Sequence, residues 1–166
     1  MAPKISPAPE IETLGSRATR TFFDSNILLY AEDAAFSDKQ KKAVELVVEH
    51  RRRRTGVVSI QVLGEFFDVA TRKLKLDPAV ARAQAEFHSR FELVEPTVAD
   101  AFGAFDLHRL YGYRYWDSLV LRCALISGCK VLLSEDMQHG HVIDGLRIVN
   151  PFLRSEERRV GKECLE

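Results

Sequence analysis

The stretch RTFFDSNILLYA, residues 20–31, decides how this chain begins to fold. Its apolar start predicts a buried strand over residues 19–23, and the residues after it predict a short helix over 25–34. Asp24 stands where the strand ends and the helix begins. Ligands of open α/β sheets bind beyond the carboxyl ends of the strands, so Asp24 is a candidate functional residue.

The rest of the chain repeats this alternation of strand and helix. Short apolar runs predict further strands over residues 57–59, 91–94, 131–134 and 146–149. Amphipathic segments predict helices over residues 38–53, 61–74, 78–90, 98–111 and 117–127. Such alternation is typical of a parallel sheet covered by helices. We therefore expect an α/β fold, a three-layer α/β/α domain around a central, mainly parallel sheet.

Three more acidic residues accompany apolar runs: Glu65, Asp117 and Asp136. Each of the four has an ordinary role open to it, namely a helix cap for Asp24, a solvated helix face for Glu65, a helix-dipole contact for Asp117 and a turn for Asp136. Together they are more informative, because the carboxyl ends of parallel strands meet at one edge of the sheet. Clustered carboxylates repel each other unless cations hold them, and their hard oxygen atoms suit Mg²⁺ or Mn²⁺.

A carboxylate cluster of this kind supports hydrolysis of a phosphodiester, in which the carboxylates hold metal and a metal-activated water attacks. Asn26 can orient a neighbouring carboxylate, and Ser134 lies beside Asp136 at the end of its strand. His139 and His141 offer a metal-free alternative, as general base and acid near Asp136. A turn or surface role is the more ordinary one for these two histidines.

Composition limits the kind of protein that this chain forms. Its 166 residues suffice for one domain, and no apolar run resembles a membrane span or a secretory signal. The 3 cysteines show no metal-ligand spacing, which favours a reduced, cytoplasmic location. The 24 basic and 24 acidic residues give zero net charge, which weakens a nucleic-acid hypothesis without excluding it, because bound metal would change the local sign.

The two ends of the chain differ from its middle. Residues 1–19 are rich in Pro, Ala and polar residues, and we expect a disordered leader there. Residues 154–166 include RSEERRVGKEC, which resembles a translated sequencing adapter, and we interpret them as an artefactual tail. The functional domain is therefore expected over residues 20–153.

Two basic segments are candidates for contact with nucleic acid. The segment RLYGYRYW, residues 109–116, interleaves cations with aromatic rings that can stack on unpaired bases. Within it Tyr113 and Arg114 are candidate substrate contacts, and Trp116 is expected in the core. The four arginines at 51–54 end a helix at the sheet edge opposite the carboxylates, where complementing the helix dipole is their ordinary role.

Five segments together resemble PIN-domain proteins, and specifically the VapC-type toxins of toxin–antitoxin pairs. They are FFDSNILLYA (22–31), SIQVLGEFFDVATRK (59–73), YWDSLVLRCALISGC (115–129), VLLSEDMQHG (131–140) and GLRIVNPF (145–152). The resemblance implies an endoribonuclease that cuts RNA with Mg²⁺ or Mn²⁺ held by Asp24, Glu65, Asp117 and Asp136. It matches Asn26 to a supporting position and makes Ser134 a neighbour of the site. It also implies a small antitoxin that blocks the site, and a homodimer.

Two other functions remain open from the sequence. A receiver-type phosphoacceptor domain also gathers acidic residues at the edge of a parallel sheet. Such domains generally carry an adjacent acidic pair and a late lysine, for which this chain offers no convincing match. A catalytically silent RNA-binding module is the second alternative. Labelling by a small phosphodonor would favour the first, and RNA binding without cleavage the second.

Overall fold

The computed structural model describes residues 18–154, which form six strands and six helices. Residues 1–17 and 155–166, nearly all of the expected leader and tail, lie outside the described residues. The strands are β1 (Thr21–Phe23), β2 (Gly56–Ser59), β3 (Glu92–Val94), β4 (Val131–Leu133), β5 (Val142–Ile143) and β6 (Leu146–Val149). The helices are α1 (Ser25–Glu32), α2 (Ser37–Arg53), α3 (Ile60–Arg72), α4 (Pro78–His88), α5 (Val98–Tyr111) and α6 (Tyr115–Ile126).

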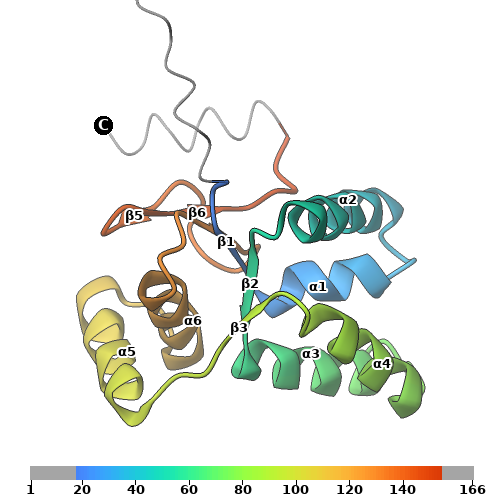
Figure 1. The fold of residues 1–166 in the computed structure, drawn as a ribbon, viewed down its shortest axis with the longest axis horizontal. Coiled ribbons are helices and arrows are strands. Elements are labelled where there is room, and N and C mark those ends of the chain that lie inside the picture. Colours follow the sequence, from blue (N-terminus) through green and yellow to red (C-terminus); the bar gives the residue numbers. More distant parts are fainter. Residues whose placement is uncertain (1–17, 155–166) are drawn as a thin grey trace, which may run out of the picture.

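The strands form one sheet in the order β3-β2-β1-β4-β6-β5. Neighbouring strands run parallel, except that β5 is antiparallel to β6. Two helices follow each of the first three strands, which gives the chain the crossover that parallel pairing requires. Figure 1 shows α1 to α4 on one side of β1, β2 and β3, with α5 and α6 on the other. The predicted three-layer α/β fold with a mainly parallel sheet is confirmed.

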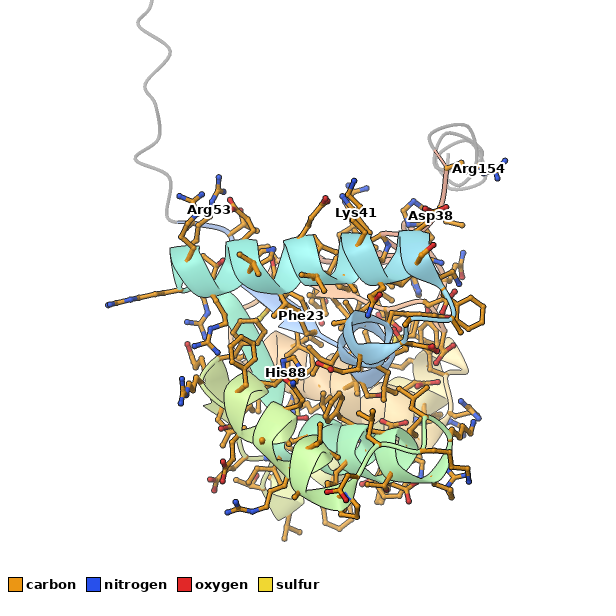
Figure 2. The ribbon with its side chains drawn as sticks, turned by 90° about the vertical axis from the view of Figure 1, so that its right-hand side faces the viewer. Phe23, Asp38, Lys41, Arg53, His88 and Arg154 are labelled. Atoms are coloured by element: carbon orange, nitrogen blue, oxygen red, sulfur yellow. The ribbon has the colours of Figure 1, made fainter. Side chains whose placement is uncertain are left out.

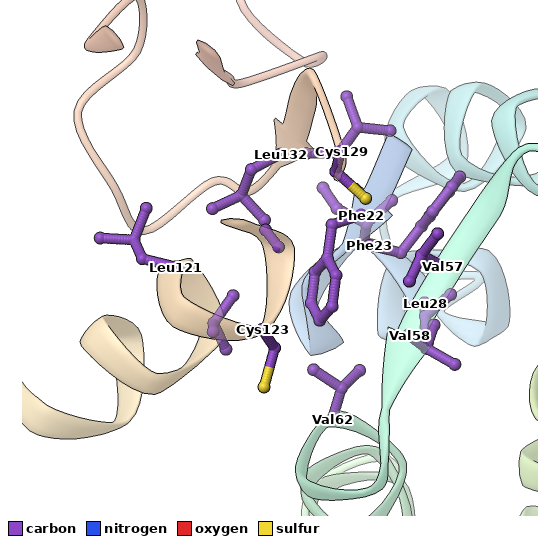
Figure 3. Packing of buried hydrophobic residues seen from close by; sticks show 14 of the residues in the cluster. Phe22, Phe23, Leu28, Val57, Val58, Val62, Leu121, Cys123, Cys129 and Leu132 are labelled. Atoms are coloured by element: carbon purple, nitrogen blue, oxygen red, sulfur yellow. The ribbon is translucent and has the colours of Figure 1, made fainter. Parts of the chain in front are cut away.

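Strand β1 lies inside the sheet and is buried on both faces. Phe22 and Phe23 are fully buried, and successive side chains of a strand point to opposite faces. The Phe23 ring packs against Phe91, just before β3, with ring centroids 5.0 Å apart. Figure 3 shows Phe22 near Cys123 of α6 and Val62 of α3. Because helices cover both faces, this strand is a continuous apolar run and not an alternating one.

The predicted strands do not include β5, which has 2 residues. It forms a hairpin with β6 across Asp144 and Gly145, whose φ angles are 48° and 81°. Positive φ at both central residues is typical of a type I′ turn, for which Asp-Gly is a favoured sequence. The Asp-Gly pair is therefore the local signal for this hairpin, since two residues are too few to show an apolar pattern.

Helix α6 begins at Tyr115, two residues before its predicted start, so Trp116 lies in its first turn. The prediction that Trp116 belongs to the core is wrong, because this residue is 62% exposed. The reason is one of length: the 12 residues of α6 span about 18 Å, whereas the 3 residues of β4 span about 10 Å. The first turn of α6 therefore projects past the carboxyl edge of the sheet.

A buried histidine, His88, ends helix α4 and is 1% exposed (Figure 2). Its ring lies edge-on to those of Phe66 and Phe87, at centroid distances of 5.1 and 5.5 Å. Among the described residues neither ring nitrogen has a hydrogen-bond partner, and a carboxylate oxygen of Glu32 lies 4.0 Å from Nε2. Burial, with a smaller contribution from Arg51, lowers the pKa of His88 to about 4. Burial also raises the pKa of Glu32.

We predict that His88 makes the fold less stable in mild acid. As the pH falls from 6.5 to about 4, the unfolded chain binds a proton that the folded protein does not, so the free energy of unfolding decreases. The variant His88→Phe should therefore lose about 2 kcal/mol less than the wild type between about pH 7.5 and 4.5. Urea denaturation at both pH values measures this difference. The exposed Val80→Ala, also in α4, is the control: it carries no titratable group and should lose as much stability as the wild type. Equal losses in His88→Phe and the wild type would contradict the prediction.

Candidate active site

The candidate site lies where the order of the strands reverses. The chain leaves β1 for β2 on one side, while β4 occupies the other side, so the carboxyl ends of β1 and β4 flank a topological switch point. Asp24 directly follows β1, and Ser134 directly follows β4. The Asp24 backbone N–H donates to the Leu133 carbonyl at 3.0 Å, which holds these two strand ends together.

The Asp24 carboxylate is buried and hydrogen-bonded through both oxygens. The residue is 4% exposed and caps the N-terminus of α1. Its Oδ1 accepts from the Ser25 backbone N–H at 2.8 Å, and its Oδ2 accepts from the Ser134 hydroxyl at 2.7 Å. The helix-capping role that the sequence allows for Asp24 is thus present, and it coincides with a place at the centre of the site.

Asn26 joins the two segments that carry Asp24 and Asp136. Its Nδ2 lies 3.1 Å from Asp136 Oδ2, 3.3 Å from Asp24 Oδ2 and 3.4 Å from Ser134 Oγ. Its Oδ1 accepts from the Glu135 backbone N–H at 3.1 Å. One amide side chain therefore holds two of the carboxylates that the sequence predicts to converge.

Asp117 and Glu65 approach the same edge of the sheet from helices. Asp117 is the third residue of α6, and its side chain is 18% exposed and 3.6 Å from Arg114 Nε. Glu65, in α3, is exposed and lines a cavity of about 460 Å³. Asn26 and Asp136 line the same cavity, so residues from three distant parts of the chain meet around it.

Burial and neighbouring charges raise the pKa values of two of the carboxylates, Asp24 and Asp117. Burial raises the pKa of Asp24 to about 7; hydrogen bonds oppose this rise, and the charges of Glu65 and Asp117 add to it. Burial likewise raises the pKa of Asp117, and the charge of Asp136 adds to that rise. Electrostatic repulsion therefore links all four acidic residues.

The donor atoms of this site suit a hard divalent cation. They are oxygens of carboxylates, with the oxygens of Asn26 and Ser134 beside them. The raised pKa of Asp24 means that its buried negative charge costs free energy, which a cation would offset. Within residues 18–154, however, no three His, Cys, Asp or Glu side chains are close enough together to hold one ion as they stand. Both observations fit carboxylates that gather at one edge but stand apart through mutual repulsion.

The loop between α5 and α6 is held firmly beside Asp117. Gly112 ends α5 with a φ of 76°, a conformation that favours glycine. The Tyr113 carbonyl accepts hydrogen bonds from His108 Nδ1 at 2.5 Å and from the Ser118 hydroxyl at 3.2 Å. Arg114 follows, with a side chain that is 84% exposed. The two candidate substrate contacts therefore differ, since Tyr113 is fixed and Arg114 extends into solvent.

The Tyr113 hydroxyl bridges to the segment that carries Asp136. It lies 2.8 Å from His141 Nδ1 and receives a hydrogen bond from the Gln138 backbone. This leaves the ring of Tyr113, but not its hydroxyl, for contact with a substrate. His139 Nδ1 accepts from the Asn150 backbone N–H at 3.0 Å. Both histidines thus have structural partners, which matches the ordinary turn role considered for them.

Lys39, in α2, is a neighbour of the site that the sequence analysis missed. Its Nζ forms an ion pair with Glu135, next to Asp136, and donates to the Tyr30 hydroxyl at 3.1 Å. The same Nζ lies 4.6 Å from the centre of the Tyr30 ring. Lys39 and Glu135 are 96 positions apart, and no local pattern marks Lys39, so the fold alone reveals this contact.

Comparison of the sequence with models of protein families identifies one family. Residues 21–143, well over half of the sequence, match the PIN domain. The chain therefore belongs to the PIN domain family. No curated protein matches the sequence.

Several solved structures share the fold. VapC20 of Mycobacterium tuberculosis, described as a toxin that cleaves the sarcin–ricin loop, has a TM-score of 0.59 and 17% identity, over 70% of this chain and 91% of that one. A toxin–antitoxin complex from Klebsiella pneumoniae has a TM-score of 0.60 and 16% identity, over 80% and 98% of the two chains. VapBC2 from Rickettsia felis, bound to a DNA fragment from its promoter, has a TM-score of 0.55 and 17% identity, over 77% and 96%. At these identities the likeness establishes the fold.

We predict that Tyr113→Phe lowers the free energy of unfolding by about 1 kcal/mol, because it removes the hydroxyl that joins two loops of the site. Tyr111→Phe is the matched control: its ring also contacts His141, at a centroid distance of 5.4 Å, but its hydroxyl is not bonded to any residue of 18–154. It should change the free energy by less than about 0.5 kcal/mol.

Urea denaturation of the two single variants, His141→Ala and the double variant Tyr113→Phe/His141→Ala measures the coupling between these side chains. Most of the loss from Tyr113→Phe should disappear in the His141→Ala background. A loss of the same size in both backgrounds would show that the hydroxyl acts elsewhere.

Proposed function

We propose that this protein is a divalent-metal-dependent endoribonuclease that acts as the toxin of a toxin–antitoxin pair. The observation that carries the proposal is the buried Asp24 carboxylate at the switch point of a PIN-family fold, with its pKa raised further by Glu65 and Asp117. VapC20, which shares this fold, is described as a toxin that cleaves the sarcin–ricin loop. RNA is accordingly the proposed substrate.

The proposed metal ligands are Asp24, Glu65, Asp117 and Asp136, with Mg²⁺ or Mn²⁺ as the ion. When bound, such an ion supplies an activated water and stabilises negative charge at the phosphate that is cut. The chain prepares for this through fixed hydrogen bonds. Ser134 and Asn26 hold the Asp24 carboxylate in one orientation, and Asn26 also holds Asp136. No side-chain nucleophile is needed in this mechanism.

Arg114 and Tyr113 are the proposed substrate contacts. The Arg114 guanidinium is exposed and close to Asp117, and its planar donors match the oxygens of a phosphate. The Tyr113 ring is half-buried and held in place by its hydroxyl, so it offers a rigid surface on which a base can stack. Arg114 thus contacts a backbone phosphate of the RNA, and Tyr113 stacks on a base.

A small antitoxin that blocks the site is the proposed protein partner. Two of the similar structures support it, one a toxin–antitoxin complex and the other VapBC2. The cavity beside Glu65 and Asp136 supports it as well, because apolar side chains such as Leu29 and Phe36 line it together with the acidic ones. A segment of another chain can bury apolar surface there while it covers the carboxylates.

A homodimer is proposed through the outer faces of α5 and α6. Large apolar side chains are exposed on these two helices, among them Val98 (75%), Phe102 (61%) and Phe105 (50%) of α5 and Ile126 (43%) of α6. An exposed apolar surface of this kind is typical of an association site. A second copy of the chain would remove these side chains from water.

We also propose a single functional domain over residues 20–153 in a cytoplasmic protein. The match to the PIN domain, over residues 21–143, falls within these bounds. Cys123 and Cys129 are free, buried thiols, which fits a reducing compartment. Within residues 18–154, no helix has both the length and the apolar character needed to cross a membrane.

The receiver-type alternative finds no support in the sheet. Receiver-like folds place their parallel strands in the order 2-1-3-4-5. Here the order is β3-β2-β1-β4-β6-β5, with an antiparallel strand at one edge. The cleavage experiment below distinguishes a nuclease from a catalytically silent RNA-binding module.

We predict that the purified protein cuts total RNA in the presence of Mg²⁺ and stops cutting in excess EDTA. Asp24→Asn and Asp117→Asn should each lower the cleavage rate at least about 100-fold, because each removes a carboxylate that holds metal. Mapping of the cut ends measures cleavage, and circular dichroism checks that each variant remains folded.

Asp106→Asn is the matched control, since Asp106 is an exposed residue of α5 that does not contact the site, and this variant should cut at the wild-type rate. Cleavage that persists in EDTA, or in Asp24→Asn, would exclude the metal mechanism. RNA that is bound but left uncut by the wild type would favour the silent binding module.

A further inference from the structure

A basic cavity lies at the end of the sheet opposite the candidate active site. It has a volume of about 340 Å³ and is lined by His50, Arg51, Arg54, Gly56, Arg90, Phe91 and Glu92. Gly56 is the first residue of β2, and Phe91 directly precedes β3. The cavity is therefore at the amino ends of these strands, and it contains none of the four carboxylates of the candidate site.

One arginine of this cavity is already held in a fixed position. The Arg51 Nη1 donates to the Phe87 carbonyl at 2.7 Å. Its guanidinium carbon lies 3.9 Å from the centre of the Phe87 ring, a cation–π contact. A guanidinium has five N–H donors, so most of the donors of Arg51 remain for a ligand.

Two further arginines line the same cavity without a partner. Arg54 and Arg90 are exposed, and neither side chain forms an ion pair or hydrogen bond with another residue of 18–154. Arg54 follows the last residue of α2 in a left-handed conformation with a φ of 56°. Glycine or asparagine would adopt that conformation with less strain, so the position keeps a cation at a conformational cost.

The acidic residues nearby are neutralised by other cations. Glu92 is paired with Arg20, whose hydrogen bond lowers the pKa of Glu92. Glu49, on α2, is paired with Arg52 and Arg53. The positive charges of the three arginines that line the cavity are therefore not balanced there.

The ordinary explanation covers only part of this cluster. Cations in the last turn of α2 complement its dipole, which accounts for Arg51, Arg52 and Arg53. The same effect can extend to Arg54, the C-cap of α2, but it does not explain why Arg90, which follows α4, meets Arg54 at one cavity. Two separate segments of the chain thus bring unpaired guanidinium groups to one cavity, and guanidinium groups bind phosphate oxygens through paired hydrogen bonds.

We infer that this cavity binds backbone phosphates of the RNA substrate at a distance from the point of cleavage. The inference rests on the proposed function. It assigns part of the binding energy for RNA to the arginines of this cavity. The whole chain has zero net charge, and its carboxylate edge repels a polyanion when no metal is bound. Helix α2 connects the two regions, since Lys39 in its first turn pairs with Glu135 beside the candidate site and Arg51 in its last turn lines the cavity. Its 17 residues span about 25 Å, a distance that an RNA strand of about 20 nucleotides exceeds.

The test uses the double variant Arg54→Glu/Arg90→Glu in a full chain that also carries Asp117→Asn, so that RNA is not cut. Fluorescence anisotropy measures the Kd for a labelled single-stranded RNA of about 20 nucleotides at several salt concentrations. The Kd should rise about tenfold or more at low salt. The slope of log Kd against log salt should decrease by about 1.4, because two phosphate contacts are lost at about 0.7 each.

The matched control is Lys75→Glu/Arg147→Glu in the same background, which changes the net charge equally, again with one residue in the left-handed conformation (Lys75, φ 58°), but outside the cavity. Its Kd should stay within about threefold of the parent value. Both double variants should keep the parent thermal midpoint within about 3 °C, since none of the four exposed side chains forms an ion pair or hydrogen bond with another residue of 18–154. Equal Kd values for the two double variants would overturn the inference. Pyrophosphate binding that needs Arg54 and Arg90, with RNA binding unchanged, would overturn it in favour of a free polyphosphate ligand.

The kinetics of RNA cleavage test the double variant Arg54→Glu/Arg90→Glu independently of the binding measurement. In the chain with Asp117 intact, Arg54→Glu/Arg90→Glu should raise KM for long RNA about tenfold and leave kcat within about twofold of the wild type, because the chemistry occurs at the other edge. A fall in kcat with an unchanged KM would contradict an anchoring role. Because anisotropy needs no cleavage, an absence of cleavage would count against the proposed function alone, and unchanged RNA binding would count against the anchor alone.

Discussion

The arrangement of the site depends on one buried carboxylate. Asp24 lies at the end of an inner strand and is 4% exposed, and a charge in that position is tolerated only when hydrogen bonds surround it. Ser134 and Asn26 supply two of these bonds, and the pairing of β1 with β4 brings Ser134 within reach. A shift of one residue in that pairing would turn the strand faces over and separate Asp24 from Ser134. The register of β1 against β4 therefore determines the geometry of the site.

The sequence predicts most of this fold because parallel strands covered on both faces appear as short apolar runs. It predicts that Asp24 and Asp136 meet, because each follows a predicted strand and the strand ends share an edge. The family resemblance adds Ser134 as a neighbour of the site. It does not predict the contact of Lys39 with Glu135 or the exposure of Trp116. Both depend on how a helix lies over the sheet and how far it projects, and these quantities are set by packing between distant segments. The distances between the carboxylates also depend on packing between distant segments, so the sequence does not predict them.

A chain with zero net charge can still carry opposite charges at the two edges of its sheet. In this protein, carboxylates collect at the carboxyl ends of the strands, and unpaired guanidinium groups collect near the amino ends of β2 and β3. The totals of 24 acidic and 24 basic residues conceal this separation. The resulting field would orient an approaching polyanion even though the net charge is zero.

The lengths of the outer strands have a consequence for aggregation. β3 has 3 residues and β5 has 2, and these two strands form the borders of the sheet. A long border strand presents a ladder of unpaired backbone groups that can recruit a strand from another molecule, and short, charged borders are a common protection against this. Glu92 adds charge at the β3 border. Growth of the sheet from molecule to molecule, the route to fibrils, is thereby disfavoured, and assembly is left to the helical surfaces.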